Sequence, residues 1–88
     1  KDITAFSFTS PSATGVITGT NIAVTVPFGT NPFGLVANFT TTGMFVKVGA
    51  MSQTSGTTAN DFTSPVTYRI TAADASTQDY TVTVTVAK

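Results

Sequence analysis

The strongest constraint on the fold of this chain is a strict alternation of apolar and polar residues near its C-terminal end. Between residues 80 and 86, a tyrosine and three valines occupy every second position, and threonines fill the positions between them. Because successive side chains of a β-strand point to opposite faces, this segment predicts a strand with one buried and one exposed face. Residues 66–72 repeat the pattern, and the turn-forming cluster 73–78 between the two segments predicts an antiparallel hairpin.

Further strand candidates are separated by turns rich in glycine, proline and asparagine. They are residues 3–8, 16–17, 22–26, 35–41, 44–48 and 51–54. Residues 55–61 are expected to form a loop, from whose end Phe62 reaches the core. No window has the apolar spacing of an amphipathic helix. About seven short strands in 88 residues predict an all-β fold, an Ig-like two-sheet antiparallel sandwich without the cysteine pair and tryptophan of antibody domains.

The composition excludes several classes of function. The chain has no histidine, cysteine or glutamate, so neither a Ser-His-Asp triad nor a Cys-His pair can be assembled, and we expect no enzymatic activity and no cofactor. Four lysines and arginines balance four acidic residues, which leaves no basic surface for nucleic acid. No apolar run is long enough to cross a bilayer, so we expect no membrane insertion by this domain.

Several segments resemble the bacterial Ig-like modules that occur in tandem in surface-exposed and secreted multidomain proteins. They follow one another through nearly the whole chain at residues 24–30, 46–49, 56–62, 64–68 and 71–84. The resemblance implies a β-sandwich that spaces or displays other domains, with no enzymatic activity and no agreed ligand. Residues 1–88 are therefore expected to be a single domain and one repeat of a larger array. Joining the C-terminal end of one copy to the N-terminal end of the next would leave almost no linker between them.

Two features depart from the pattern of these modules. A glycine usually follows the Ala73-Asp74 pair, whereas this chain has Ala75. A positive φ at this position would be costly for alanine, so we expect a different or slightly strained turn. Phe33 and Phe45 stand where these modules more often have small or polar residues.

Two chemical sites are weighed against simpler interpretations. Calcium takes about six to eight oxygen ligands, and Asn60-Asp61 is the one adjacent pair of suitable residues. An intramolecular isopeptide bond needs a buried lysine, and the internal Lys47 is expected to point outward from its strand. We therefore expect no metal site, and we interpret the aspartates as residues that cap turns.

The exposed aromatic residues are the most open question. Alternation within residues 44–48 turns Phe45 and Lys47 toward solvent, and the inward positions are expected to be Met44, Val46 and Val48. If Phe33 and Phe45 are exposed and close together, they form an apolar patch for a partner, so the candidate partner contacts are Phe33, Phe45 and Lys47. The interpretation that we favour is that Phe33 folds back into the core and that a neighbouring strand covers Phe45.

These observations predict a non-catalytic structural or adhesion-associated module that spaces and displays domains on a bacterial cell surface. The alternative is a ligand-binding module that recognises a host protein or glycan through exposed aromatic residues and loops. In both cases we expect an extracellular or cell-surface location, with neighbouring repeats of the same chain as partners.

Overall fold

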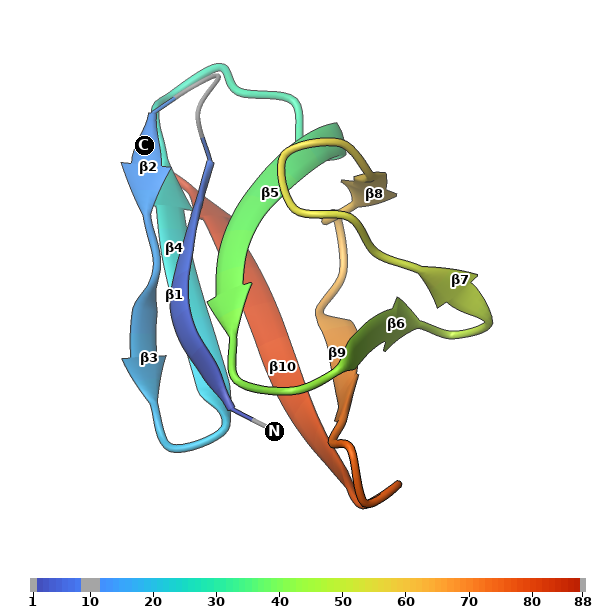
Figure 1. Ribbon diagram of the computed structural model, residues 1–88. Coiled ribbons are helices and arrows are strands. Elements are labelled where there is room, and N and C mark those ends of the chain that lie inside the picture. Colours follow the sequence, from blue (N-terminus) through green and yellow to red (C-terminus); the bar gives the residue numbers. More distant parts are fainter. Residues whose placement is uncertain (1, 9–11, 88) are drawn as a thin grey trace.

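The fold is a two-layer β-sandwich, described by a computed structural model for residues 2–8 and 12–87 (Figure 1). One sheet has the order β2-β1-β5-β8, with strands β1 (Ile3–Phe8), β2 (Ala13–Thr14), β5 (Phe33–Thr41) and β8 (Ala59–Asp61). The other has the order β3-β4-β10-β9-β6-β7, with strands β3 (Val16–Thr18), β4 (Asn21–Val26), β6 (Phe45–Val48), β7 (Met51–Ser52), β9 (Val66–Thr71) and β10 (Thr77–Val86). The predicted all-β two-sheet sandwich is confirmed, and within the described residues no helix could cross a membrane.

The pairing of β10 confirms the predicted hairpin and also corrects one expectation. β9 and β10 pair antiparallel, with Tyr68 opposite Tyr80 and Thr67 opposite Thr81. On its other side, however, β10 runs parallel to β4, so the sheet is not wholly antiparallel. Parallel neighbours need a long crossover connection, and the chain between β4 and β10 passes through both sheets before it returns.

Two of the short strands were not predicted. β2 contains two residues, and β8 contains three residues inside the segment that the sequence indicated as a loop. Both lie at the edges of the four-stranded sheet, where each pairs with one neighbour only. Such short polar edge strands carry no apolar alternation, so periodicity does not reveal them.

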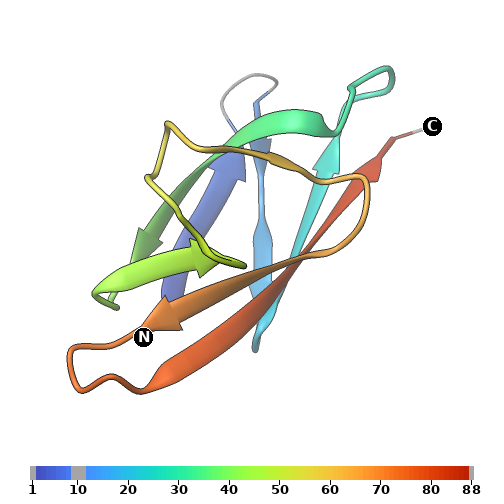
Figure 2. The ribbon, with the colours of Figure 1, turned by 90° about the vertical axis from the view of Figure 1, so that its right-hand side faces the viewer.

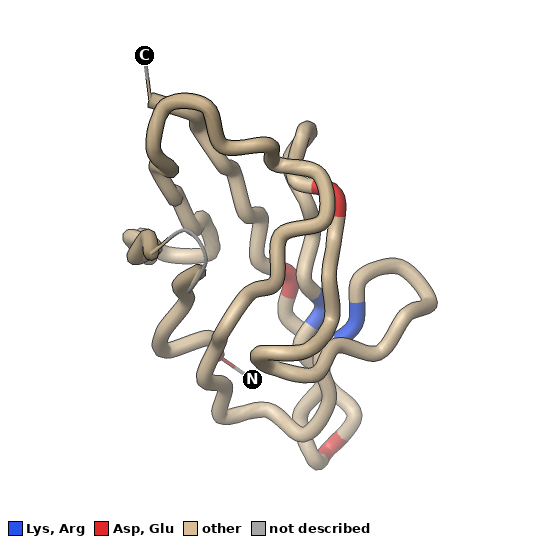
Figure 3. The backbone as a smooth tube through the Cα atoms, turned by 90° about the horizontal axis from the view of Figure 1, so that it is seen from above, with Lys and Arg blue, Asp and Glu red and all other residues tan. Residues whose placement is uncertain are grey.

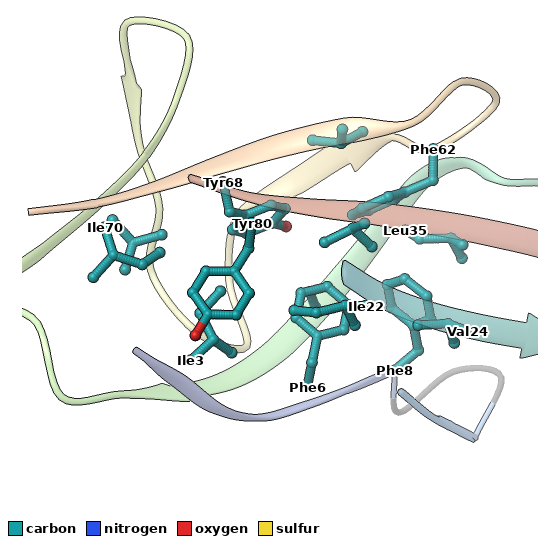
Figure 4. Packing of buried hydrophobic residues seen from close by; sticks show 14 of the residues in the cluster. Ile3, Phe6, Phe8, Ile22, Val24, Leu35, Phe62, Tyr68, Ile70 and Tyr80 are labelled. Atoms are coloured by element: carbon teal, nitrogen blue, oxygen red, sulfur yellow. The ribbon is translucent and has the colours of Figure 1, made fainter. Parts of the chain in front are cut away.

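The core lies between the two sheets and combines aliphatic side chains with a cluster of aromatic rings (Figure 4). Tyr68 of β9 is fully buried and packs edge-to-face against Phe6 of β1, with ring centroids 5.5 Å apart. Phe62, which follows β8, stacks against Tyr68 at 6.5 Å and meets Phe8 edge-on at 5.2 Å. The prediction that Phe62 reaches the core is confirmed. These contacts join the sheets through geometries that aromatic quadrupoles favour.

The hydroxyl of Tyr68 is the polar end of this aromatic cluster. It accepts a hydrogen bond of 3.2 Å from the Asn60 side-chain amide, whose nitrogen also donates to Gln53 at 2.7 Å. A buried hydroxyl needs such a partner, because an unpaired one costs free energy. Burial disfavours the phenolate and raises the pKa of Tyr68 to about 12, although the hydrogen bond from Asn60 acts in the opposite direction.

The turn between β9 and β10 contains a strained alanine. Ala75 has φ of 70°, the only positive φ among the described residues other than glycine. The Ala75 amide donates to the Ala72 carbonyl at 2.9 Å, and the Ala72 amide donates to the Ser76 carbonyl at 2.8 Å. The expected strain at this departure from the bacterial Ig-like pattern is therefore confirmed.

Candidate functional site

The structure separates the three predicted contact residues into two places. Phe33 begins β5, whereas Phe45 and Lys47 lie in β6, which follows the other end of β5. β5 has nine residues, a length of about 25–30 Å, so Phe33 and Phe45 do not form a joint patch. Phe45 and Lys47 do lie together, because residues two apart in a strand share a face. The outward direction predicted for Lys47 is confirmed.

The expectation that Phe33 folds back into the core is wrong. Its side chain is 68% exposed, whereas Leu35, two residues later, is buried. Regular alternation would place both side chains on the same face, but the pairing with β8 shifts register between them. The residue between them, Gly34, has φ of +81°, a conformation that favours glycine. The bulge turns Phe33 away from the core, as bulges commonly do with a side chain.

The expectation that a neighbouring strand covers Phe45 is also wrong. Phe45 is 57% exposed, while Val46 beside it is buried. The residue opposite Phe45 on β9 is Thr71, whose small side chain cannot cover a phenyl ring. Met44, expected to face inward, is also exposed because it precedes the first residue of β6.

Phe45 and Lys47 belong to a surface that we call the outer face, formed by the solvent-facing side chains of β6, β9 and β10. Strand register places Lys47 opposite Arg69, and Arg69 opposite Asp79, in one row across the face. Phe45 stands in the next row, opposite Thr71. An open hollow of about 250 Å³ next to this row is lined by Gly49, Thr67 and Arg69.

The charges of the outer face are partly paired. Arg69 donates to both carboxylate oxygens of Asp79, at 2.9 Å from Nε and 3.2 Å from Nη2. These hydrogen bonds lower the pKa of Asp79 and raise that of Arg69. Lys47 adds a second positive charge beside Arg69, and the two basic segments lie next to each other in Figure 3. The row therefore has one net positive charge next to an exposed aromatic ring.

The residues considered for calcium are engaged in other contacts. The Asn60 amide donates to Gln53 and Tyr68, and Asp61 accepts hydrogen bonds from the Thr63 amide at 3.0 Å and the Thr63 hydroxyl at 2.6 Å. These two bonds lower the pKa of Asp61. Within residues 2–8 and 12–87, no group of three or more acidic side chains could hold a metal ion. Asp61 is thus a turn-capping residue, as its sequence context indicated.

Two further surface features lie outside the predicted contacts. An open hollow of about 400 Å³ between β1 and the β2–β3 segment is lined by Thr4, Ala5, Phe6, Ser7, Thr14, Gly15 and Ile17. None of these side chains is titratable, so the hollow has no group for acid–base chemistry. Phe28, in the loop between β4 and β5, is 72% exposed. Its place after Pro27 and before Gly29 indicates a turn, which was the available sequence signal.

The fold and these surfaces define a β-sandwich module that offers exposed contact surfaces. A family model described as "SGBP, N-terminal" matches residues 3–84, so the chain belongs to this family. The family comprises N-terminal domains of glycan-binding surface proteins. The bacterial surface-protein context implied by the resemblance is thereby confirmed, whereas the occurrence in tandem repeats stays a prediction.

Two solved structures are similar to this chain. The first is a candidate glycoside hydrolase from Bacteroides thetaiotaomicron, with 32% identity and a TM-score of 0.75, matched over 99% of this chain and 25% of that one. This chain thus spans a quarter of that protein. The second is a candidate secreted protein from Bacteroides fragilis, with 17% identity and a TM-score of 0.60, covering 100% of this chain and 94% of that one. This second likeness concerns the fold alone. No curated protein matches.

Proposed function

We propose that this domain is a non-catalytic module of a bacterial cell-surface protein, where it spaces and displays the glycan-binding parts of that protein. The observation that carries the proposal is the family match over residues 3–84. The composition agrees, since a chain without histidine, cysteine or glutamate lacks the usual nucleophile–base pairs. The proposed location is extracellular or on the cell surface, and the proposed partners are neighbouring repeats or domains of the same protein.

The shape of the domain supports a spacing role. Its principal extents are 42 × 23 × 19 Å, so it is about twice as long as it is wide. β1 begins at one end of the sandwich and β10 finishes at the other, as Figures 1 and 2 both show. A domain entered at one end and left at the other adds its length to an array. A short junction between such domains limits bending.

The test is to delete this domain from the full-length surface protein. We expect an unchanged affinity for the glycan in solution, measured by calorimetry, and reduced capture of polymeric glycan by intact cells. A variant in which an unrelated β-sandwich of similar length replaces the domain should restore capture, because spacing depends on length and not on particular side chains. A loss of solution affinity in the deletion variant would contradict the spacer role.

A second candidate function is direct contact with a glycan or host protein through the outer face. The favouring observation is the exposure of Phe45 beside the row of Lys47, Arg69 and Asp79. An aromatic ring can pack against the C–H face of a sugar, while neighbouring polar groups fix its orientation. The face is open and shallow, so we expect weak binding, with a Kd of about 0.1–1 mM.

This candidate is tested by comparing variants of the outer face on glycan and host-matrix arrays. Phe45→Ala and Lys47→Gln should each weaken any binding that the wild-type protein shows. Phe33→Ala is the matched control, because Phe33 is also more than half exposed but lies at the end of β5 that is far from β6. Equal losses in Phe45→Ala and Phe33→Ala would show that the outer face is not the contact surface.

A further inference from the structure

Residues 27–33, which are the loop between β4 and β5 together with the first residue of β5, carry the two most exposed large apolar side chains of the described residues. Phe28 is 72% exposed and Phe33 is 68% exposed. Both lie at the end of the sandwich where β4 finishes, away from the outer-face row around Phe45. Two exposed phenyl groups on one short connection mark a surface that a partner can cover.

Several backbone contacts hold this loop in place. The Thr30 amide donates to the Pro27 carbonyl at 3.1 Å, and the Phe33 amide donates to Asn31 Oδ1 at 3.0 Å. The amide of Phe62, a core residue, donates to the Pro32 carbonyl at 2.9 Å. Two prolines further restrict the backbone. A loop ordered before contact loses little entropy when its side chains are covered.

The described chain leaves the sandwich directly beside this loop. β10 runs parallel to β4 to its last residue, where Val86 lies opposite Val26. The Ala87 amide then donates to the Val26 carbonyl at 2.8 Å, one residue before Pro27. Figure 2 shows the C-terminal end and the loop after β4 at the same corner of the molecule. A few further residues, at about 3.5 Å each, would hold a following domain close to Phe28.

The comparisons indicate which partner this position favours. The family consists of N-terminal domains, and the Bacteroides thetaiotaomicron protein is about four times as long as the part that this chain matches. We infer that Phe28 and Phe33 pack against the domain that follows this one in the full-length protein, so that the two domains move as one body. Residues 27–33 contain no charged side chain, which suits a protein contact better than a polar ligand.

The inference rests on the proposed spacing role in one respect, which is that another domain must follow this one. If Phe28 and Phe33 do not pack against that domain, the spacing role is not contradicted. The first test measures cysteine accessibility in the full-length protein, since this domain has no cysteine of its own. Phe28→Cys and the control Phe45→Cys are labelled with a maleimide, and the modified peptides are quantified by mass spectrometry. We expect labelling at position 28 to be about tenfold slower than at position 45, because only position 28 would be covered.

Equal labelling rates at the two positions would overturn the inference. Protection of position 28 that arises only when glycan is added would overturn it as well, because the loop would then be a ligand site. Neither result would affect the spacing role, which the deletion experiment tests separately.

A second test measures domain motion by small-angle scattering from the full-length protein. The double variant Phe28→Ser/Phe33→Ser should broaden the distribution of interdomain distances, while Met44→Ser/Phe45→Ser should leave it unchanged. All four positions are more than half exposed in this domain, so none of these changes removes a core contact. Identical distributions for the wild type and the loop double variant would refute the docking.

Discussion

Ala75 is a left-handed turn residue, and replacing it with glycine should raise the free energy of unfolding. Most substitutions of another residue by glycine lower it. Ala75 is exposed and has φ of 70°, so Ala75→Gly removes no core contact and relieves the steric conflict of its Cβ atom. The two backbone hydrogen bonds of the turn, from Ala75 to Ala72 and from Ala72 to Ser76, are available to glycine as well. We therefore expect Ala75→Gly to stabilise the domain.

The magnitude follows from two opposing terms. A left-handed conformation costs a residue with a Cβ atom about 1–2 kcal/mol, and glycine avoids this cost. Glycine also increases the conformational entropy of the unfolded chain, which lowers the free energy of unfolding by about 0.4–1 kcal/mol. The balance is a gain of about 0.5–1 kcal/mol. For a domain of 88 residues this raises Tm by about 2–6 °C.

The assay is thermal and urea unfolding followed by circular dichroism, with Ala73→Gly as the matched control. Ala73 lies in the same turn and is also exposed, but it is not among the residues with positive φ. Ala73→Gly should therefore be destabilising by about 0.4–1 kcal/mol, the entropic term alone. If both variants lower Tm by the same amount, the positive φ of Ala75 stores no strain and the reasoning fails.

Three other predictions concern burial, close packing and charge. Between about pH 10 and 12 the unfolded chain loses the Tyr68 proton while the folded chain keeps it, so the free energy of unfolding falls by about 2–3 kcal/mol. Urea titrations at several pH values should show this loss in the wild type and not in Tyr68→Phe. Gly15→Ala should lower the stability by about 1–3 kcal/mol in thermal unfolding, because the added Cβ would lie 2.8 Å from the Phe6 carbonyl oxygen. In Gly49→Ala the added Cβ would meet open space, but φ of +59° should make this substitution cost about 1–2 kcal/mol through backbone strain instead of a clash. Arg69→Gln should raise the pKa of Asp79 in a carboxyl NMR titration, because the substitution removes the hydrogen bonds from Arg69 that lower this pKa. In the wild type, the stability that Asp79 contributes is present above its usual pKa and is lost as pH falls through the lowered value.

The strands with strong alternation could be predicted because one of their faces is buried. The valines of β4 at positions 24 and 26 and Val82 of β10 are almost fully buried, and the threonines between them face outward or are less buried. The same physical rule placed Lys47 on the outside of β6. It failed for the parallel pairing of β4 with β10, because alternation specifies a face but not a neighbour.

The positions of the exposed rings could be predicted only in part. Phe45 obeys alternation, so its outward direction followed from the sequence, and the error was to assume a covering strand. Phe33 does not obey alternation, because the bulge at Gly34 changes the register by one position. A glycine inside a strand pattern is a known sign of a bulge, and the Phe33-Gly34 pair was the available signal.

Phe33 and Phe45 lie too far apart to belong to one contact surface, so the domain has two separate surfaces with an exposed aromatic ring. A single patch would have required one partner to cover both rings, whereas the structure assigns them to surfaces separated by the length of β5. The end that carries Phe28 and Phe33 is next to the point where the chain leaves the fold, and the outer face with Phe45 is on the side of a sheet. A following domain can reach the first surface without obstructing the second. The spacing role and direct contact with a glycan are therefore compatible in one molecule, and the paired variants at positions 33 and 45 distinguish them.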